Sequence, residues 1–79
     1  MATSIVKVYN SRYNEWADNA RVELQWDGIR NLGFSRTVYT NRNGVAEIDH
    51  SSTGECTVYV NGQKTRTTFY APNTITVTI

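Results

Sequence analysis

The chain has 79 residues, so we expect residues 1–79 to form one small domain. Its formal net charge is +1, with eight Lys and Arg against seven Asp and Glu, which gives no electrostatic field to attract nucleic acid or an acidic membrane. One Cys excludes an internal disulfide, and one Cys with one His excludes a metal site built from several such residues. The sequence also lacks a phosphate-binding loop and paired carboxylates, so we expect no metal and no cofactor.

The sequence carries no recognisable targeting or membrane-spanning segment. A strand-like pattern follows Ala2-Thr3-Ser4 directly, and no run of about 18 apolar residues is present. We therefore expect a cytoplasmic protein. The alternative is a domain excised from a secreted parent, but the unpaired Cys56 fits a reducing compartment better.

The composition predicts an all-β domain. Eleven Thr, eight Val and five Ile stand against two Leu and one Met. Branched and aromatic side chains fit a pleated surface and lose rotamer freedom in a helix. Eight Asn and five Gly supply the residues that tight turns require.

Short alternating segments, separated by turn residues every 8–12 positions, predict strands in chain order. The expected strands are Ile5–Tyr9, Ala20–Trp26, Arg36–Thr40, Val45–Asp49, Glu55–Val60, Lys64–Tyr70 and Thr74–Ile79. The expected turns include Asp27-Gly28, Asn41–Gly44, Ser51–Gly54, Asn61-Gly62 and a break at Ala71–Asn73. Seven such strands predict an antiparallel β-sandwich.

The alternation also predicts which side chains face the core. The inward set comprises Val22, Leu24, Trp26, Ala46, Ile48, Cys56, Val58, Val60, Ile75, Val77 and Ile79. Residues 10–19 are polar with two aromatics, and they form either a loop or a short helical turn. Residues 29–35 form a variable segment before the third strand.

Two stretches resemble the carboxypeptidase-regulatory-like family. They are Thr40-Asn41-Arg42-Asn43-Gly44-Val45-Ala46-Glu47-Ile48 and Gly54-Glu55-Cys56-Thr57-Val58-Tyr59-Val60-Asn61-Gly62. Ala20–Leu24 looks like the second strand of that family, and Ile75–Ile79 looks like its last. The resemblance implies a Greek-key sandwich of the transthyretin-like (prealbumin-like) fold. It says little about function, because the family occurs as an accessory module in many unrelated proteins.

The departures from the family bear on activity. Cys56 stands where the family usually has Tyr, and residues 10–19 are more aromatic than in the family. A branch of the fold hydrolyses hydroxyisourate with several His and Arg and a Tyr-Arg-Gly-Ser-like tail, whereas this chain has one His and ends Thr76-Val77-Thr78-Ile79. Related surface modules form Lys–Asn isopeptide bonds beside a buried acid. Lys7, Glu47 and Asn73 supply the residue types, but Lys7 lies between Val6 and Val8 and is expected to point outward.

Asp49, His50 and Cys56 are the nearest approach to a catalytic set. A Cys nucleophile needs a base within hydrogen-bond reach and an accessible thiolate. Cys56 shares the expected inward face of Val58 and Val60, where burial raises the pKa of a thiol and makes it inert. We therefore expect no catalytic residues and no enzyme activity.

Two groups of residues are candidates for binding. Tyr9, Tyr13 and Trp16 cluster in or beside the first loop, and exposed aromatics anchor protein interfaces and stack on sugar rings. Thr74, Thr76 and Thr78 lie on an uncharged last strand, which is a template for pairing if it forms a sheet edge. The expected function is thus a protein-binding or self-associating module, with a carbohydrate-binding module as the alternative.

Overall fold

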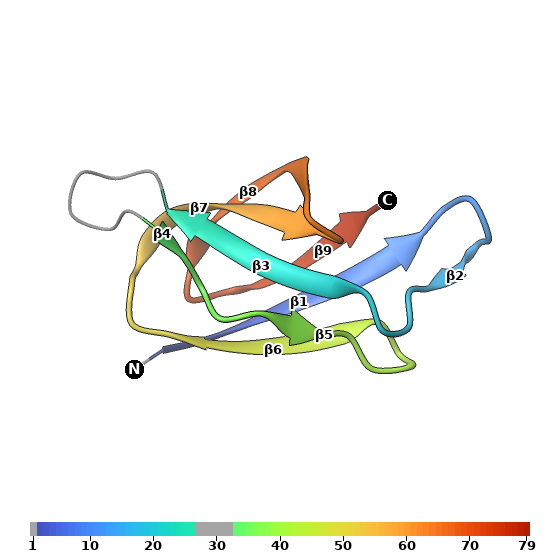
Figure 1. The fold of residues 1–79 in the computed structure, drawn as a ribbon, viewed down its shortest axis with the longest axis horizontal. Helices are drawn as coiled ribbons and strands as arrows, with labels where there is room; N and C mark the ends of the chain where they lie inside the picture. Colours follow the sequence, from blue (N-terminus) through green and yellow to red (C-terminus); the bar gives the residue numbers. More distant parts are fainter. Residues whose placement is uncertain (1, 27–32) are drawn as a thin grey trace.

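In the computed structural model, residues 2–26 and 33–79 are described, and they form an all-β sandwich of two sheets (Figure 1). The described strands are β1 (Ala2–Asn10), β2 (Glu15–Trp16), β3 (Arg21–Trp26), β4 (Gly33–Phe34), β5 (Val38–Tyr39), β6 (Val45–His50), β7 (Gly54–Val60), β8 (Gln63–Ala71) and β9 (Thr74–Thr78).

The first sheet is built around β1. Strand β6 pairs antiparallel along one side of β1, and the short β2 continues that side at the end of β1. Val8 marks the junction, because its N–H donates to Gly44 O (2.8 Å) while its C=O accepts from Ala17 N–H (2.9 Å). Strand β9 pairs with the opposite side of β1 and runs parallel to it.

The second sheet is built around β3 and β7, which pair antiparallel from Val22↔Val60 to Trp26↔Cys56. Strand β8 pairs with the outer side of β7, and its ladder shifts register between Thr57 and Tyr59. The short strands β4 and β5 pair with the two ends of β3 on its other side. Every pair in this sheet is antiparallel.

Among the described strands, the chain crosses between the two sheets four times, at the β2–β3, β5–β6, β6–β7 and β8–β9 connections. As a result, the ends of β1, β7 and β9, the start of β3 and the β5–β6 loop gather at one end of the sandwich (Figure 1). We call this end, where the β1–β2, β2–β3, β5–β6 and β7–β8 connections meet, the loop end.

The core lies between the sheets and follows the predicted alternation. Its fully buried side chains include Val6, Val8, Val22, Leu24, Ile48, Val58 and Val77. Trp26, Ala46, Cys56 and Val60 are also buried, as the alternation predicted. Ile75 packs partly buried against this cluster. Branched side chains alternating at period two let each strand bury one face and leave the other face to solvent.

The strand pattern differs from the expected seven antiparallel strands. Residues 10–19 are neither pure loop nor helix, because Glu15–Trp16 pairs with the end of β1 as β2. The expected strand Arg36–Thr40 shrinks to Val38–Tyr39, and Gly33–Phe34 adds a further short pair. The sequence pattern does not predict these two-residue strands, because alternation can be detected only over several consecutive residues.

Two further expectations need correction. The β1–β9 pair is parallel, because both strands run toward the loop end. Ile79, expected to face the core, is 38% exposed because it lies past Thr78, where β9 ends at the loop end. The expected turn at Asp27-Gly28 and most of the expected segment 29–35 lie outside the described residues.

Candidate functional site

The β9 strand is an edge of its sheet, and the hydrogen-bond pattern shows which of its backbone groups stay outside the ladder. Ile5 N–H donates to Asn73 O (2.9 Å), Ile79 N–H donates to Tyr9 O (2.8 Å), and Ser11 N–H donates to Ile79 O (3.0 Å). Odd-numbered residues therefore bond to β1. Because backbone groups alternate sides along a strand, those of Thr74, Thr76 and Thr78 point to the outer side.

Only some of these outward backbone groups already have a hydrogen-bond partner. The N–H of Thr74 donates to its neighbour, Asn73 Oδ1 (2.8 Å), so the side chain of Asn73 occupies one outward donor. Within the described residues β9 pairs with β1 alone. The outward N–H and C=O groups of Thr76 and Thr78 thus face a position at which the described chain places no strand.

The other sheet edges carry features that discourage pairing. Strand β8 has Lys64 and Arg66 and an irregular register, β6 has exposed Glu47 and Asp49, and β4 and β5 are two residues long. Charged side chains, bulges and short strands are the means by which proteins protect sheet edges. Among the edges of the described strands, β9 is the regular and uncharged one.

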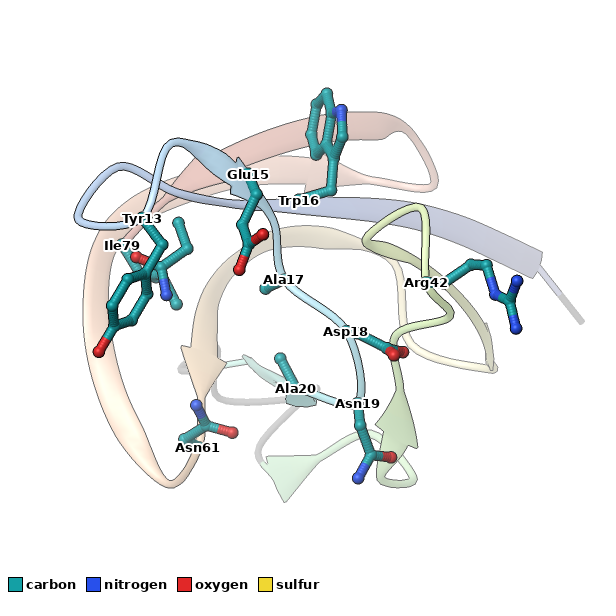
Figure 2. A pocket seen from close by; sticks show the side chains of 11 residues that line it. Tyr13, Glu15, Trp16, Ala17, Asp18, Asn19, Ala20, Arg42, Asn61 and Ile79 are labelled. Carbon is teal, nitrogen blue, oxygen red and sulfur yellow. The ribbon is translucent and has the colours of Figure 1, made fainter.

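A hollow of about 550 Å³ lies at the loop end (Figure 2). Its lining comes from residues 10–20, the β5–β6 loop, the β7–β8 turn and the residue after β9: Asn10, Tyr13, Glu15, Trp16, Ala17, Asp18, Asn19, Ala20, Arg42, Asn61 and Ile79. Figure 2 shows the carboxylate of Glu15 extending between the ring of Tyr13 on one side and Ala17 on the other, while the ring of Trp16 points away from the centre.

The three predicted aromatic residues do not form one platform. Trp16 and Tyr9 lie on paired strands, with ring centroids 5.2 Å apart and ring planes at 83°, so their rings meet edge to face. Trp16 also covers Gly44, where an added Cβ would lie 3.1 Å from two atoms of its side chain. Trp16 is still 43% exposed. It therefore packs as a lid over the β5–β6 loop with one part open to solvent.

Tyr13 is separate from this pair. It is 65% exposed, and the guanidinium carbon of Arg12 lies 5.8 Å from the centre of its ring. Tyr9 is half-buried, and its hydroxyl donates to Asn14 Oδ1. The structure thus brings Tyr9 and Trp16 together and places Tyr13 on the opposite wall of the hollow from Asp18 and Arg42 (Figure 2).

Cys56 is buried, as predicted, with 2% of its surface exposed. Desolvation, with a smaller contribution from the charge of Glu55, raises the pKa of its thiol to about 11. The thiol donates to Phe69 O at 3.6 Å. His50 has its hydrogen bonds elsewhere, so Asp49, His50 and Cys56 do not assemble as a nucleophile with its base.

The contact between His50 and Ser4 was not predicted from the sequence. Ser4 Oγ lies 2.8 Å from His50 Nε2, and His50 Nδ1 lies 2.6 Å from Ser52 O. A carbonyl can only accept, so Nδ1 carries the proton, and in the neutral ring Nε2 accepts from the Ser4 hydroxyl. Ser4 is fully buried. This Ser–His pair therefore has a nucleophile that no substrate can reach, and we interpret it as a structural network.

The residue types for an isopeptide bond are present but not arranged for one. Lys7 is partly exposed on the outer face of its sheet, beside Thr76 of β9 and Val45 of β6. Glu47 is exposed rather than buried. The side chain of Asn73 is hydrogen-bonded to the backbone of Thr74. A buried acid beside a Lys–Asn pair is thus missing from this arrangement.

Within residues 2–26 and 33–79, no group of three or more His, Cys, Asp or Glu could hold a metal ion. No helix in these ranges is long and apolar enough to cross a membrane. No family model, curated protein or solved structure matches the chain.

Proposed function

We propose that the protein is a non-enzymatic interaction module whose binding element is the outer edge of β9. In the absence of another partner, a second copy of the chain occupies this edge. The observation that carries the proposal is the combination at β9 of outward backbone groups on Thr76 and Thr78 with the absence of any charged side chain. An edge of this kind is a template for another strand.

The resemblance to the carboxypeptidase-regulatory-like family agrees with this proposal. We infer a transthyretin-like, Greek-key sandwich from that resemblance, and the four crossings between the sheets support it. Members of the family act as accessory modules, which is a role that needs a binding surface rather than a catalytic one.

Sedimentation velocity over a concentration series tests the proposal with two matched variants. Thr76→Lys places a charge on β9, and Thr68→Lys places the same charge at an exposed Thr of β8. We expect the wild type and Thr68→Lys to associate as concentration rises, and Thr76→Lys to remain monomeric over the same range. Identical sedimentation of the wild type and Thr76→Lys, whether as monomer or as oligomer, would contradict occupation of this edge by a second copy, and the proposal is wrong altogether if no extended peptide binds at β9 either.

The alternative function is carbohydrate binding at the loop end. The hollow there combines an exposed Tyr13 ring with the carboxylate of Glu15 and the amides of Asn19 and Asn61. Aromatic faces and polar groups of this kind bind sugar rings and their hydroxyls. The perpendicular rings of Tyr9 and Trp16 do not supply a flat stacking surface, so Tyr13 would carry this function.

A glycan array separates the two functions. If the loop end binds sugars, Tyr13→Ala abolishes binding and Tyr70→Ala, a variant of an equally exposed Tyr on β8, leaves it unchanged. Absence of binding by the wild type, together with association that depends on Thr76, would leave the β9 edge as the functional element.

A further inference from the structure

Strand β8, in the second sheet, shifts register along its ladder with β7, and the chain then turns at Pro72-Asn73 into β9. From this turn the two strands diverge, and β8 runs beyond β9 on the side away from β1 (Figure 1). A strand added to the outer edge of β9 would therefore lie under β8, in the layer of β1 and β9.

Burial along β8 decreases from the turn toward the start of the strand. Its inward-facing residues near the turn, Phe69 and Ala71, are buried. Thr65 and Thr67 belong to the same alternating set, yet they remain partly exposed. The side chains of Thr65 and Thr67 thus keep contact with solvent, and the hydroxyl of Thr65 donates to Val58 O at 2.6 Å.

We propose that the occupant of this position is a single extended segment of a partner protein, which runs antiparallel to β9 beneath β8 with β-branched or small side chains facing inward. This inference rests on the proposed function, since it names the kind of chain that the β9 edge accepts. A second folded sandwich fits less well, because its own β8 would have to share the layer already occupied by β8 of the first copy.

The outward backbone groups of β9 pair most favourably with a segment that runs antiparallel. In an antiparallel pair, the residue opposite Thr76 exchanges two hydrogen bonds with it, and the residue opposite Thr78 does the same. The C=O of Thr74 accepts one more, although its N–H is held by Asn73 Oδ1. Parallel pairing is slightly less stable per residue, so the antiparallel direction is preferred.

The side chains of the segment follow from the alternation. Residues of the added segment that lie opposite Thr76 and Thr78 have their side chains on the outer face, beside these threonines. Residues of the added segment that lie opposite Ile75 and Val77 face inward, toward Thr65 and Thr67 of β8. Lys or Glu at these inward positions would lose hydration without gaining an ionic partner, so small or β-branched residues are required.

The test uses a peptide with the sequence of residues 73–79 between two added lysines, titrated into the isotope-labelled protein. We expect the amide signals of Thr76 and Thr78 to shift. A nitroxide at the amino end of the peptide should broaden Thr78 more than Thr74, and a nitroxide at the carboxyl end should do the reverse. A control peptide with lysine in place of its Ile and Val residues should not bind.

Two protein variants test the backbone geometry. Thr76→Pro removes an outward N–H but none of the bonds to β1, so we expect peptide binding to weaken roughly tenfold or more. Protection of the Lys7 and Tyr9 amides from hydrogen exchange should show that the β1–β9 ladder persists. Thr76→Val keeps the N–H and should bind the peptide as the wild type does.

The outcomes separate this inference from the proposed function. If the nitroxide at the amino end broadens Thr74 more than Thr78, the segment runs parallel to β9 and the inference is wrong. The inference is also wrong if the peptide fails to bind a protein whose self-association depends on Thr76. In the latter case β9 is still the binding edge, but its occupant is a folded second copy. If neither the peptide nor a second copy uses β9, both the inference and the proposed function are wrong.

Discussion

The hydroxyl of Ser4 on β1 donates to Nε2 of His50 on β6, across 2.8 Å in the interior of the sandwich. The same hydroxyl oxygen accepts from the N–H of Asn73, at 3.2 Å, in the turn before β9. His50 in turn donates from Nδ1 to Ser52 O. One buried hydroxyl therefore joins the first strand, the β6–β7 connection and the turn that positions the candidate binding edge.

Replacement of Ser4 by Ala should destabilise the protein by roughly 1–3 kcal/mol, because it leaves His50 Nε2 without a donor in a buried site. Thr3→Ala is the matched control, since Thr3 donates to Asp49 Oδ1 at 2.7 Å in an exposed position. We expect that control to change stability by less than about 0.5 kcal/mol. Urea denaturation of both variants measures the difference, and equal losses would show that the Ser4 bond has no special role.

Cys56 should react slowly with thiol reagents in the folded protein and should give a measurable pH dependence of stability. The folded pKa of about 11 lies above the ordinary value of 9.0, so the unfolded chain releases this proton first. The protonated thiol contributes its full share to the free energy of unfolding below pH 9. This contribution is lost between pH 9 and 11, so the free energy of unfolding falls by up to about 3 kcal/mol. The stability difference between the wild type and Cys56→Ala, measured by denaturation at several pH values, isolates this effect from Lys and Tyr titration.

The opposite results would be rapid stoichiometric labelling, or a difference between the wild type and Cys56→Ala that does not vary with pH. Either would show that the thiol is accessible to solvent. Cys56→Ser should cost roughly 1–3 kcal/mol, because it buries a hydroxyl in an apolar site.

Gly44 has the positive φ expected for the β5–β6 loop, at 75°. An added Cβ there would lie 2.6 Å from Val8 O and 3.1 Å from the side chain of Trp16. Gly54 also has a positive φ, but nothing lies within 4 Å of its position for a Cβ. Gly54→Ala should therefore show the conformational cost alone, roughly 1 kcal/mol, and Gly44→Ala should cost more.

Thermal denaturation of the two alanine variants gives the steric contribution as their difference. Gly44→Val adds a branched side chain at the same position and should cost at least roughly 1–3 kcal/mol. Equal melting temperatures of Gly44→Ala and Gly54→Ala would mean that Trp16 moves aside without cost.

Asn61 and Gly62 form the β7–β8 turn, with φ angles of 54° and 80°. The Oδ1 of Asn61 also accepts from Arg21 N–H at 3.0 Å, which ties the turn to the start of β3. Asn61→Gly keeps the backbone conformation and loses this bond, whereas Asn61→Ala loses both. We expect Asn61→Ala to be less stable than Asn61→Gly by roughly 1 kcal/mol, measured by chemical denaturation. The reverse order would contradict the assigned role of the positive φ.

The sequence by itself determined the β class, the two Asn-Gly turns and the buried alternation of Val22, Leu24 and Trp26. These are local properties, because side-chain branching and turn chemistry act between residues close in the chain. It also indicated that β9 is uncharged. The burial of Cys56 followed in the same way from its place in the alternation with Val58.

Only the tertiary structure decided which strands pair and where side chains distant in sequence meet. The parallel pairing of β9 with β1 assigns the outward backbone groups to Thr76 and Thr78, and no local pattern encodes that choice. The Ser4–His50 bond joins residues 46 positions apart, and the two-residue strand β2 forms because β1 offers a partner. Such contacts depend on the register between distant segments, which the chain acquires only when its apolar faces pack together.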